Sequence, residues 1–88
     1  MKSPVYSTRF KKEYKLSQRR GLDLGKIDKI IAQLVNELPL PPQNRDHDLI
    51  GDYIGCRECH IQSDWLLIYK IDGNDIIFLR TGTHSDLF

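Results

Sequence analysis

The feature of this sequence that most constrains its fold is a change in hydrophobic periodicity at a cluster of prolines. Before the prolines, apolar residues recur at the spacing of one helical face, namely Ile27, Ile30, Ile31, Leu34, Val35 and Leu38. After them, apolar and polar residues alternate with the period of a β-strand. Pro39, Pro41 and Pro42 end the helix, because proline lacks the amide donor and disfavours helix in the residue before it. The chain is therefore expected to place its helices before its sheet.

Weaker signals complete the predicted order of elements. Residues 4–7 can form a first strand, and Thr8 offers an N-cap for a helix that runs to about Arg20 and is broken by Gly21. Residues 45–51 are expected to form an exposed loop. Strands are predicted at residues 53–61, 65–71 and 75–83, with a hairpin turn at residues 72–74.

This order, β-α-α-β-β-β, predicts an α+β fold in which two N-terminal helices pack on one face of an antiparallel sheet. The other face of the sheet is expected to be free for a ligand. A chain of 88 residues with 40% hydrophobic and 28% charged residues fits a single domain over residues 1–88. One core this small gives marginal stability, so a tightly bound partner would add to it.

The lengths of the apolar segments predict a protein of the cytoplasm. The longest such stretch, residues 65–69, is far below the roughly 20 residues that cross a bilayer. Residues 1–10 lack the apolar centre of a signal peptide. No membrane partner is therefore expected, and Cys56 and Cys59 are predicted to be thiols in a reducing compartment.

The run from Cys56 to His60 matches the haem-attachment pattern C-x-x-C-H, which is an alternative to be weighed. Met1 is the only methionine that could act as a second axial ligand, and no export signal is recognised. The pattern also falls in a predicted strand, where residues three apart face opposite sides. Cys56 and Cys59 are therefore expected to hold neither haem nor zinc, and no cofactor is predicted.

Charge is distributed unevenly along the chain. Residues 1–29 carry nine Lys or Arg against three acids, and the remainder carries four against nine, although the net charge is only +1. On the first predicted helix, Lys12, Lys15 and Arg19 form one stripe. Such a basic segment either contacts a polyanion or keeps an exposed helix soluble. The charge pattern by itself leaves both interpretations open.

All three histidines fall in the second half of the chain, at the edges of predicted elements. His47 lies in the loop after the helices, His60 near the end of a strand, and His84 just after the last strand. Imidazole titrates near neutral pH, so two histidines can serve as acid and base together. These positions predict an acid–base site.

Arg80, Gly82 and His84 alternate along the last predicted strand, so the arginine and histidine are expected to flank open space above the glycine. An anion would fit there. Cleavage of RNA by its own 2′-hydroxyl needs a base, an acid and a cation for the phosphate, and Asp64 could orient one histidine. His, Asp and Arg supply these roles without a metal.

Each candidate residue also has a structural interpretation. Trp65 and Phe88 could stack on an unstacked base, but Trp65 could equally be a core residue and Phe88 a frayed end. Asp64 could be a turn residue, Arg80 a salt-bridge partner, and His47 or His60 an ordinary surface residue. Only the convergence of several of these residues favours a catalytic site.

A set of ordered motifs identifies a family. The motifs are Arg45-Asp46-His47, Leu49, Gly51, Arg57, His60, Asp64-Trp65, Leu67-Ile68-Tyr69, Arg80-Thr81-Gly82-Thr83-His84 and Leu87-Phe88. The chain thereby resembles the YafQ branch of the RelE superfamily, toxins of bacterial type II toxin–antitoxin pairs. Length and element order agree over nearly the whole chain, and the motif match is close from His47 to Phe88.

This resemblance implies a RelE-like microbial RNase fold and a ribosome-dependent endoribonuclease that cuts messenger RNA in the decoding site. It implies as partners the 70S ribosome with its mRNA and a cognate antitoxin that wraps around the toxin, with operon DNA contacted only through the antitoxin. The family's functional positions correspond to His47, His60, Asp64, Trp65, Arg80, His84 and Phe88. The basic helix with Lys11, Lys12, Lys15 and Arg19 then corresponds to a ribosomal RNA contact.

Our hypothesis assigns His84 as general acid, His60 with Asp64 as the base side, Arg80 to the phosphate and His47 to a supporting role. The acid and the base could be exchanged. The alternative is a non-catalytic module on the same fold that binds RNA or an antitoxin.

Overall fold

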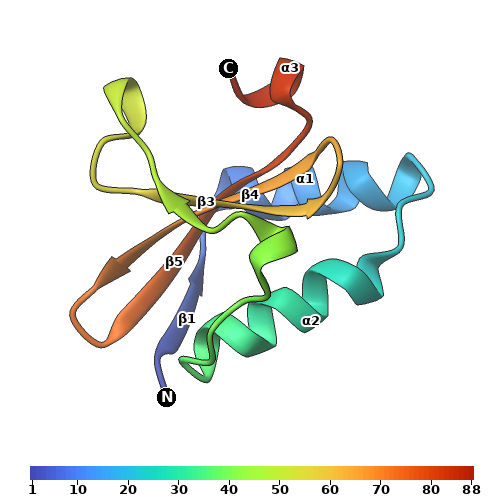
Figure 1. Cartoon of the computed structure of the whole chain (residues 1–88). Helices are drawn as coiled ribbons and strands as arrows, with labels where there is room; N and C mark the ends of the chain where they lie inside the picture. Colours follow the sequence, from blue (N-terminus) through green and yellow to red (C-terminus); the bar gives the residue numbers. More distant parts are fainter.

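The computed structural model describes all residues from Met1 to Phe88 and has the predicted α+β architecture (Figure 1). Its elements in chain order are β1 (Ser3–Tyr6), α1 (Thr8–Arg19), α2 (Leu24–Val35), the 3₁₀ turn η1 (Pro42–Asn44), β2 (His47–Asp48), the 3₁₀ turn η2 (Gly51–Tyr53), β3 (Arg57–Gln62), β4 (Trp65–Asp72), β5 (Asp75–Gly82) and α3 (His84–Leu87). No helix has the length and apolar composition needed to cross a membrane.

The five strands form one mixed sheet in the order β1-β5-β4-β3-β2. From β2 to β5 neighbouring strands are antiparallel, as predicted, but β1 pairs with β5 in parallel. The expectation of a purely antiparallel sheet was therefore wrong. The two helices carry the chain away from β1 before the meander begins, so hairpin geometry does not fix the direction of the first strand.

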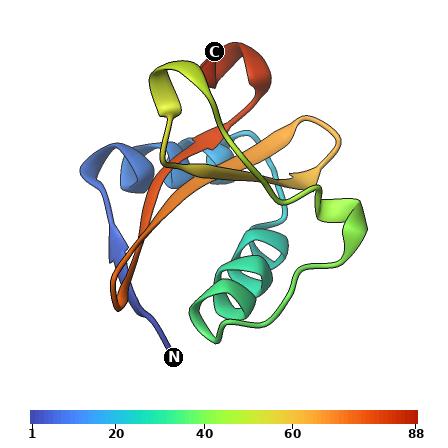
Figure 2. The same cartoon turned by 60° about the vertical axis from the view of Figure 1, so that its left-hand side comes forward.

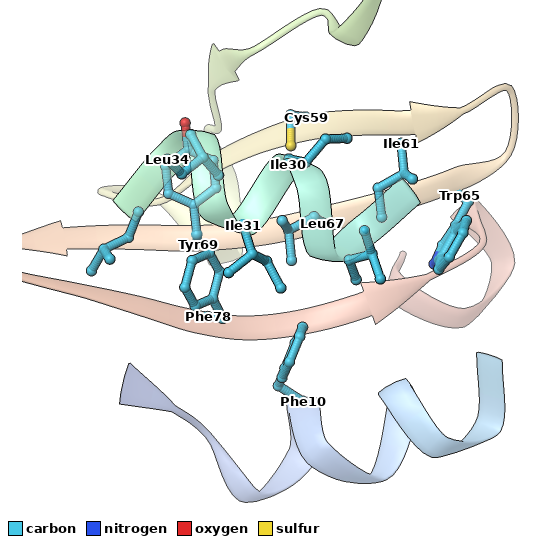
Figure 3. Packing of buried hydrophobic residues seen from close by; sticks show 12 residues of the cluster. Phe10, Ile30, Ile31, Leu34, Cys59, Ile61, Trp65, Leu67, Tyr69 and Phe78 are labelled. Carbon is cyan, nitrogen blue, oxygen red and sulfur yellow. The ribbon is translucent and has the colours of Figure 1, made fainter. Parts of the chain in front are cut away.

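Both helices pack on the same face of the sheet, as predicted. Phe10 of α1 and the apolar stripe of α2 form one cluster with the side chains of β3, β4 and β5 that point toward the helices (Figure 3). The labelled members of this cluster are Phe10, Ile30, Ile31, Leu34, Cys59, Ile61, Trp65, Leu67, Tyr69 and Phe78. This face holds the main core.

The opposite face is partly covered, contrary to the expectation that it would be free. Figures 1 and 2 both place α3 on the side of the sheet away from α2. Leu87 of α3 packs there with Cys56, Leu66 and Ile68, and Tyr53 of η2 lies against the same small cluster. Only the part of this face near β2, β3 and the β3–β4 turn remains for a ligand.

Helix ends differ from the predictions by a few residues for identifiable reasons. Ser7, rather than Thr8, caps α1, because its hydroxyl oxygen accepts from the amide of Phe10. Helix α2 ends at Val35 and not at the prolines, since Glu37 takes a left-handed conformation (φ 60°). Leu38 is consequently exposed and does not extend the apolar face.

The second half contains three short elements that periodicity did not predict, namely β2, η2 and α3. Strand β2 lies within the expected loop 45–51, and α3 follows the last strand. The predicted strand 53–61 begins only at Arg57, because η2 precedes it. Elements this short carry too few residues for a repeating pattern.

The two cysteines are free thiols on opposite faces of the sheet. Cys59 is fully buried among the residues of the main core, and burial raises the pKa of its thiol to about 12. Cys56 packs with Leu87 on the other side. They do not converge on a common ligand, which agrees with the strand argument against haem or zinc.

Candidate active site

The candidate site lies on the face of the sheet away from the helices. Side chains alternate along β3, so Glu58 and His60 share this face, whereas Cys59 points into the core. His47 of β2 pairs directly with Glu58 across the edge of the sheet. Pairing across β4 also places Arg80 of β5 on this face.

His47 and His84 both lie close to His60. Its ring centroid lies 5.9 Å from that of His84 and 6.4 Å from that of His47. These residues come from three separate elements, β2, β3 and α3, and the sheet register together with the turn into α3 brings them together. The predicted convergence of the imidazoles is present.

Asp64 pairs with His84. The carboxylate Oδ1 accepts from the ring Nδ1 of His84 at 2.8 Å and from its backbone amide at 3.1 Å. Both side chains are more than half exposed. The backbone and ring hydrogen bonds from His84 lower the pKa of Asp64, so the carboxylate is charged and faces an imidazole whose Nε2 is left for a substrate. The hypothesis placed Asp64 beside His60. In the structure Asp64 instead binds His84.

His60 is the most buried of the three histidines. Burial lowers its pKa, and the nearby charges of Arg45, His84 and His47 lower it further, while Glu58 acts in the opposite direction. Asn44 donates to the carbonyl oxygen of His60 at 2.7 Å and so fixes the strand beneath the ring. A neutral imidazole in this position has the form required of a general base.

His47 has a hydrogen-bond acceptor near each ring nitrogen. Nδ1 donates to the carbonyl oxygen of Arg45, and Nε2 lies 3.5 Å from Oε1 of Glu58. The residues flanking His47 are fixed by ion pairs of Arg57 with Asp46 and Asp48.

Two residues near the histidines were missed by the sequence analysis. Glu58 is a carboxylate only 4% exposed between His47 and His60. The signal for it was present, because it stands two residues before His60 in a strand. Arg45 is exposed, makes no ion pair, and lies close enough for its charge to affect His60. Arg45 had been placed in an exposed loop and in the motif Arg45-Asp46-His47, but without a role at the site.

Arg80 lies in a buried ion pair, which agrees with its interpretation as a salt-bridge partner. Its Nη2 lies 2.7 Å from Oε2 of Glu13 on α1, and its Nη1 donates to the hydroxyl of Tyr53 at 3.0 Å. Hydrogen bonds to Glu13 hold the pKa of Arg80 above its ordinary value. Its guanidinium is therefore engaged on several sides and is not an open phosphate site.

The open space expected above Gly82 is filled. Strand β5 ends at this glycine, and a Cβ added to it would lie 2.8 Å from the carboxylate oxygen of Asp86. That carboxylate accepts from the amide of Thr83 and from Arg20. The prediction of an anion pocket between Arg80 and His84 was wrong, because α3 folds back over the glycine.

The two aromatic candidates have different positions. Trp65 is 1% exposed and donates its indole N–H to Thr81, so it is a core residue and its ring is not open to a base. Phe88 is exposed, and its ring centroid lies 6.5 Å from that of His84. Of the two, only Phe88 is placed where it could contact a nucleotide at the site.

The basic stripe of α1 is exposed, with Lys11, Lys12, Lys15 and Arg19 all open to solvent. Lys11 and Lys15 also border an apolar groove of about 700 Å³ between β1, α1 and α2. A smaller hollow of about 260 Å³ adjoins Asp64 and Thr83. Neither of these two hollows is lined by a histidine; His47 and His84 are exposed, and His60 is partly buried between them.

The chain matches one protein family along almost its whole length. The family described as "Bacterial toxin of type II toxin-antitoxin system, YafQ" matches residues 2–88. The "mRNA interferase toxin YafQ" of Escherichia coli strain K12 is 43% identical over 84 residues, which are 94% of this chain and 91% of that protein.

Solved structures agree with this match. A chain of the E. coli DinJ–YafQ complex superposes with a TM-score of 0.93 at 40% identity, covering 100% of this chain and 99% of that chain. A metal-bound toxin from Helicobacter pylori superposes with a TM-score of 0.93 at 38% identity, covering both chains fully. In the present structure no three His, Cys, Asp or Glu side chains converge closely enough to hold a metal ion.

Proposed function

The chain belongs to the YafQ family of type II toxin–antitoxin toxins, and we propose that it is an mRNA interferase that cuts messenger RNA in the ribosomal decoding site by acid–base catalysis. The observation that carries this proposal is the cluster of three imidazoles with Asp64 bound to His84. The E. coli relative at 43% identity bears the same activity in its name.

The chemistry follows from the different surroundings of His60 and His84. Partly buried and neutral, His60 takes the proton of a 2′-hydroxyl, whose oxygen attacks the adjacent phosphorus. The bond from phosphorus to the 5′-oxygen breaks, and His84, oriented by the hydrogen bond from its Nδ1 to Asp64, donates a proton to that oxygen from Nε2. The products are a 2′,3′-cyclic phosphate and a 5′-hydroxyl. No step requires a metal or cofactor.

The phosphate needs a positive charge, and Arg80 and Arg45 are the two arginines that could supply it. Arg80 could reach the phosphate only by exchanging one of its buried partners. Arg45 is exposed beside His60 and has no ion-pair partner. We therefore assign the direct phosphate contact to Arg45, with His47 as a second contact, and give Arg80 the role of holding Tyr53 and α3 in place.

Dependence on the ribosome fits a site without a deep cleft. His47 and His84 are exposed, Trp65 is buried, and Phe88 is the one exposed aromatic ring beside them. Such a surface holds free RNA weakly, so the ribosome must present the messenger. The basic stripe of α1 supplies a salt-sensitive contact to ribosomal RNA.

The direct test uses purified chain, 70S ribosomes and a defined messenger. The protein is first stripped with a chelator and desalted, because the ribosomes themselves need Mg²⁺. We expect codon-phased cuts with cyclic phosphate ends, only with ribosomes present and at the same rate after stripping. Equal cutting of free messenger would refute ribosome dependence, and activity restored only by added transition metal would refute the metal-independent mechanism.

A partner of opposite charge fits the groove beside α1. Tyr6, Tyr14, Ile31 and Val35 line it, and Lys11 and Lys15 border it. An acidic, amphipathic antitoxin segment would bury these apolar side chains and neutralise the lysines. Since both lysines also belong to the basic stripe, a bound antitoxin would cover part of the ribosomal contact. The related YafQ of E. coli was crystallised with DinJ.

Filling this groove should separate antitoxin binding from catalysis. Ala32 is exposed and lines the groove, so Ala32→Trp would occupy its volume without touching the main core. We expect the affinity for the co-expressed cognate antitoxin to fall at least about tenfold, with messenger cleavage unchanged. Lys29→Trp, also exposed on α2 but outside the groove, is the control. Equal affinities of both variants in calorimetry would exclude this groove as the antitoxin site.

A further inference from the structure

Glu58 places a carboxyl group where polar atoms are costly to bury. It is 4% exposed, and its Oε2 has no hydrogen-bond partner. Burying a polar or ionised group without partners is unfavourable, so such groups are rare in folded proteins unless they have a role. The reaction assigned above to His60 and His84 does not use Glu58 directly.

The other oxygen of Glu58 faces two histidines at once. Oε1 lies 3.5 Å from Nε2 of His47 and 3.6 Å from Nε2 of His60. Both rings therefore direct the same nitrogen toward one buried oxygen. For His60 this leaves Nδ1 as the nitrogen available to a substrate.

The remaining groups around Glu58 do not balance its charge. Its cross-strand neighbour in β4 is Ile68, which is apolar, and Arg80 beyond it in β5 is paired with Glu13. Arg57, the preceding residue of β3, is paired with Asp46 and Asp48. The other charged or titratable groups near His60 are Arg45, which is exposed, and His84, which is paired with Asp64. The polar groups that Glu58 faces are therefore the rings of His47 and His60.

We propose, on the basis of the function given above, that Glu58 is a positioning residue that faces Nε2 of both His47 and His60 and turns the Nε2–H of His60 inward, so that His60 presents Nδ1 to the messenger. His47 is oriented by the same carboxylate at Nε2 and by the carbonyl of Arg45 at Nδ1. One buried carboxylate thus orients one histidine and sets the tautomer of another.

The variants Glu58→Gln and Glu58→Asp separate this role from packing. Glutamine has the same size but no charge, whereas aspartate keeps the charge on a shorter side chain. Asp48→Asn is the matched control, because Asp48 lies on β2 next to His47 but contacts Arg57 instead of the histidines. Thermal unfolding confirms that each variant is folded before it is assayed.

The first measurement is NMR of the histidine ring nitrogens in the free protein, which does not depend on cleavage. In the wild type we expect a single Nε2–H tautomer of His60. In Glu58→Gln the ring of His60 should show mixed tautomers, because the carboxylate that faces its Nε2 is lost. Spectra of Glu58→Gln identical to those of the wild type would overturn the proposal, even if the chain cleaves no RNA.

The second measurement is single-turnover cleavage of ribosome-bound messenger from pH 5 to 9. We expect Glu58→Gln to be at least about tenfold slower with unchanged half-saturation by ribosomes. Removing the negative charge lowers the pKa of His60, so the acidic limb of the profile should move to lower pH. Glu58→Asp should restore part of the rate. A Glu58→Gln profile that overlays the wild type would show that Glu58 is only a packing residue.

Discussion

Replacing His84 with alanine is expected to slow messenger cleavage by about a thousandfold or more, because the acid that protonates the departing 5′-oxygen is lost. The side chain is 56% exposed and its only hydrogen-bond partner is Asp64. Its removal should therefore leave the fold intact. Single-turnover cleavage on programmed ribosomes measures the rate, and circular dichroism should show an unchanged unfolding temperature.

Asp64→Asn tests whether the pair acts as a unit. Asparagine can still accept from the backbone amide of His84, but it cannot stabilise the charged imidazole, so we expect a loss of about 10- to 100-fold. The double variant should be no slower than His84→Ala alone, because residues that act together are not additive. Ser85→Ala, on the exposed position next to His84, is the control. Growth arrest of equal strength by wild type and His84→Ala would point to a non-catalytic binding module.

Replacing Glu13 with alanine should produce the largest loss of stability outside the apolar core. The carboxylate of Glu13 and the guanidinium of Arg80 are 15% and 10% exposed, and three hydrogen bonds join Glu13 to Arg80 and to the amide of Thr81. Without Glu13, the charge of Arg80 is buried and uncompensated. We expect the free energy of unfolding to fall by about 3 kcal/mol, which lowers Tm by roughly 12–24 °C in a chain of this size.

The control for this prediction is a glutamate in an exposed ion pair. Glu37 contacts the N-terminal ammonium and Lys2 with a side chain 53% exposed, so Glu37→Ala should change stability far less than Glu13→Ala does. Urea unfolding of both variants gives the comparison. In Glu13→Ala, Arg80→Met should recover part of the loss, since it removes the orphaned charge. Equal stabilities of Glu13→Ala and Glu37→Ala would contradict the buried ion pair.

Long periodic segments allowed much of the fold to be predicted. The stripe from Ile27 to Leu34 predicted α2 and its buried face, and alternation predicted β4 and β5. The parallel pairing of β1 with β5 was not predicted, because pairing partners distant in sequence leave no local pattern. Helix α3 was missed for a related reason. Its stability comes from the capping box of Thr83 and Asp86 and from packing of Leu87, which depend on the folded sheet.

The site was predicted in part, for reasons of residue type and burial. Histidine and aspartate at element edges are unusual enough to be noticed, so His47, His60, Asp64 and His84 were found. Residue type alone does not give burial, and for this reason Trp65 and Arg80 were assigned contacts that their positions do not support. Glu58 was overlooked because a glutamate in a strand is ordinarily solvent-exposed.

The bond between Glu13 and Arg80 also has a geometric consequence. Glu13 stands on α1 between Lys12 and Lys15, so the helix that carries the basic stripe is anchored directly to β5. The lysines and the imidazoles are thus parts of one rigid body whose largest dimension is 33 Å. A ribosomal RNA contact made through α1 would fix the spacing between the point of attachment and the scissile bond. The reading frame of the cuts would then follow from the dimensions of the domain and need no recognition of messenger sequence.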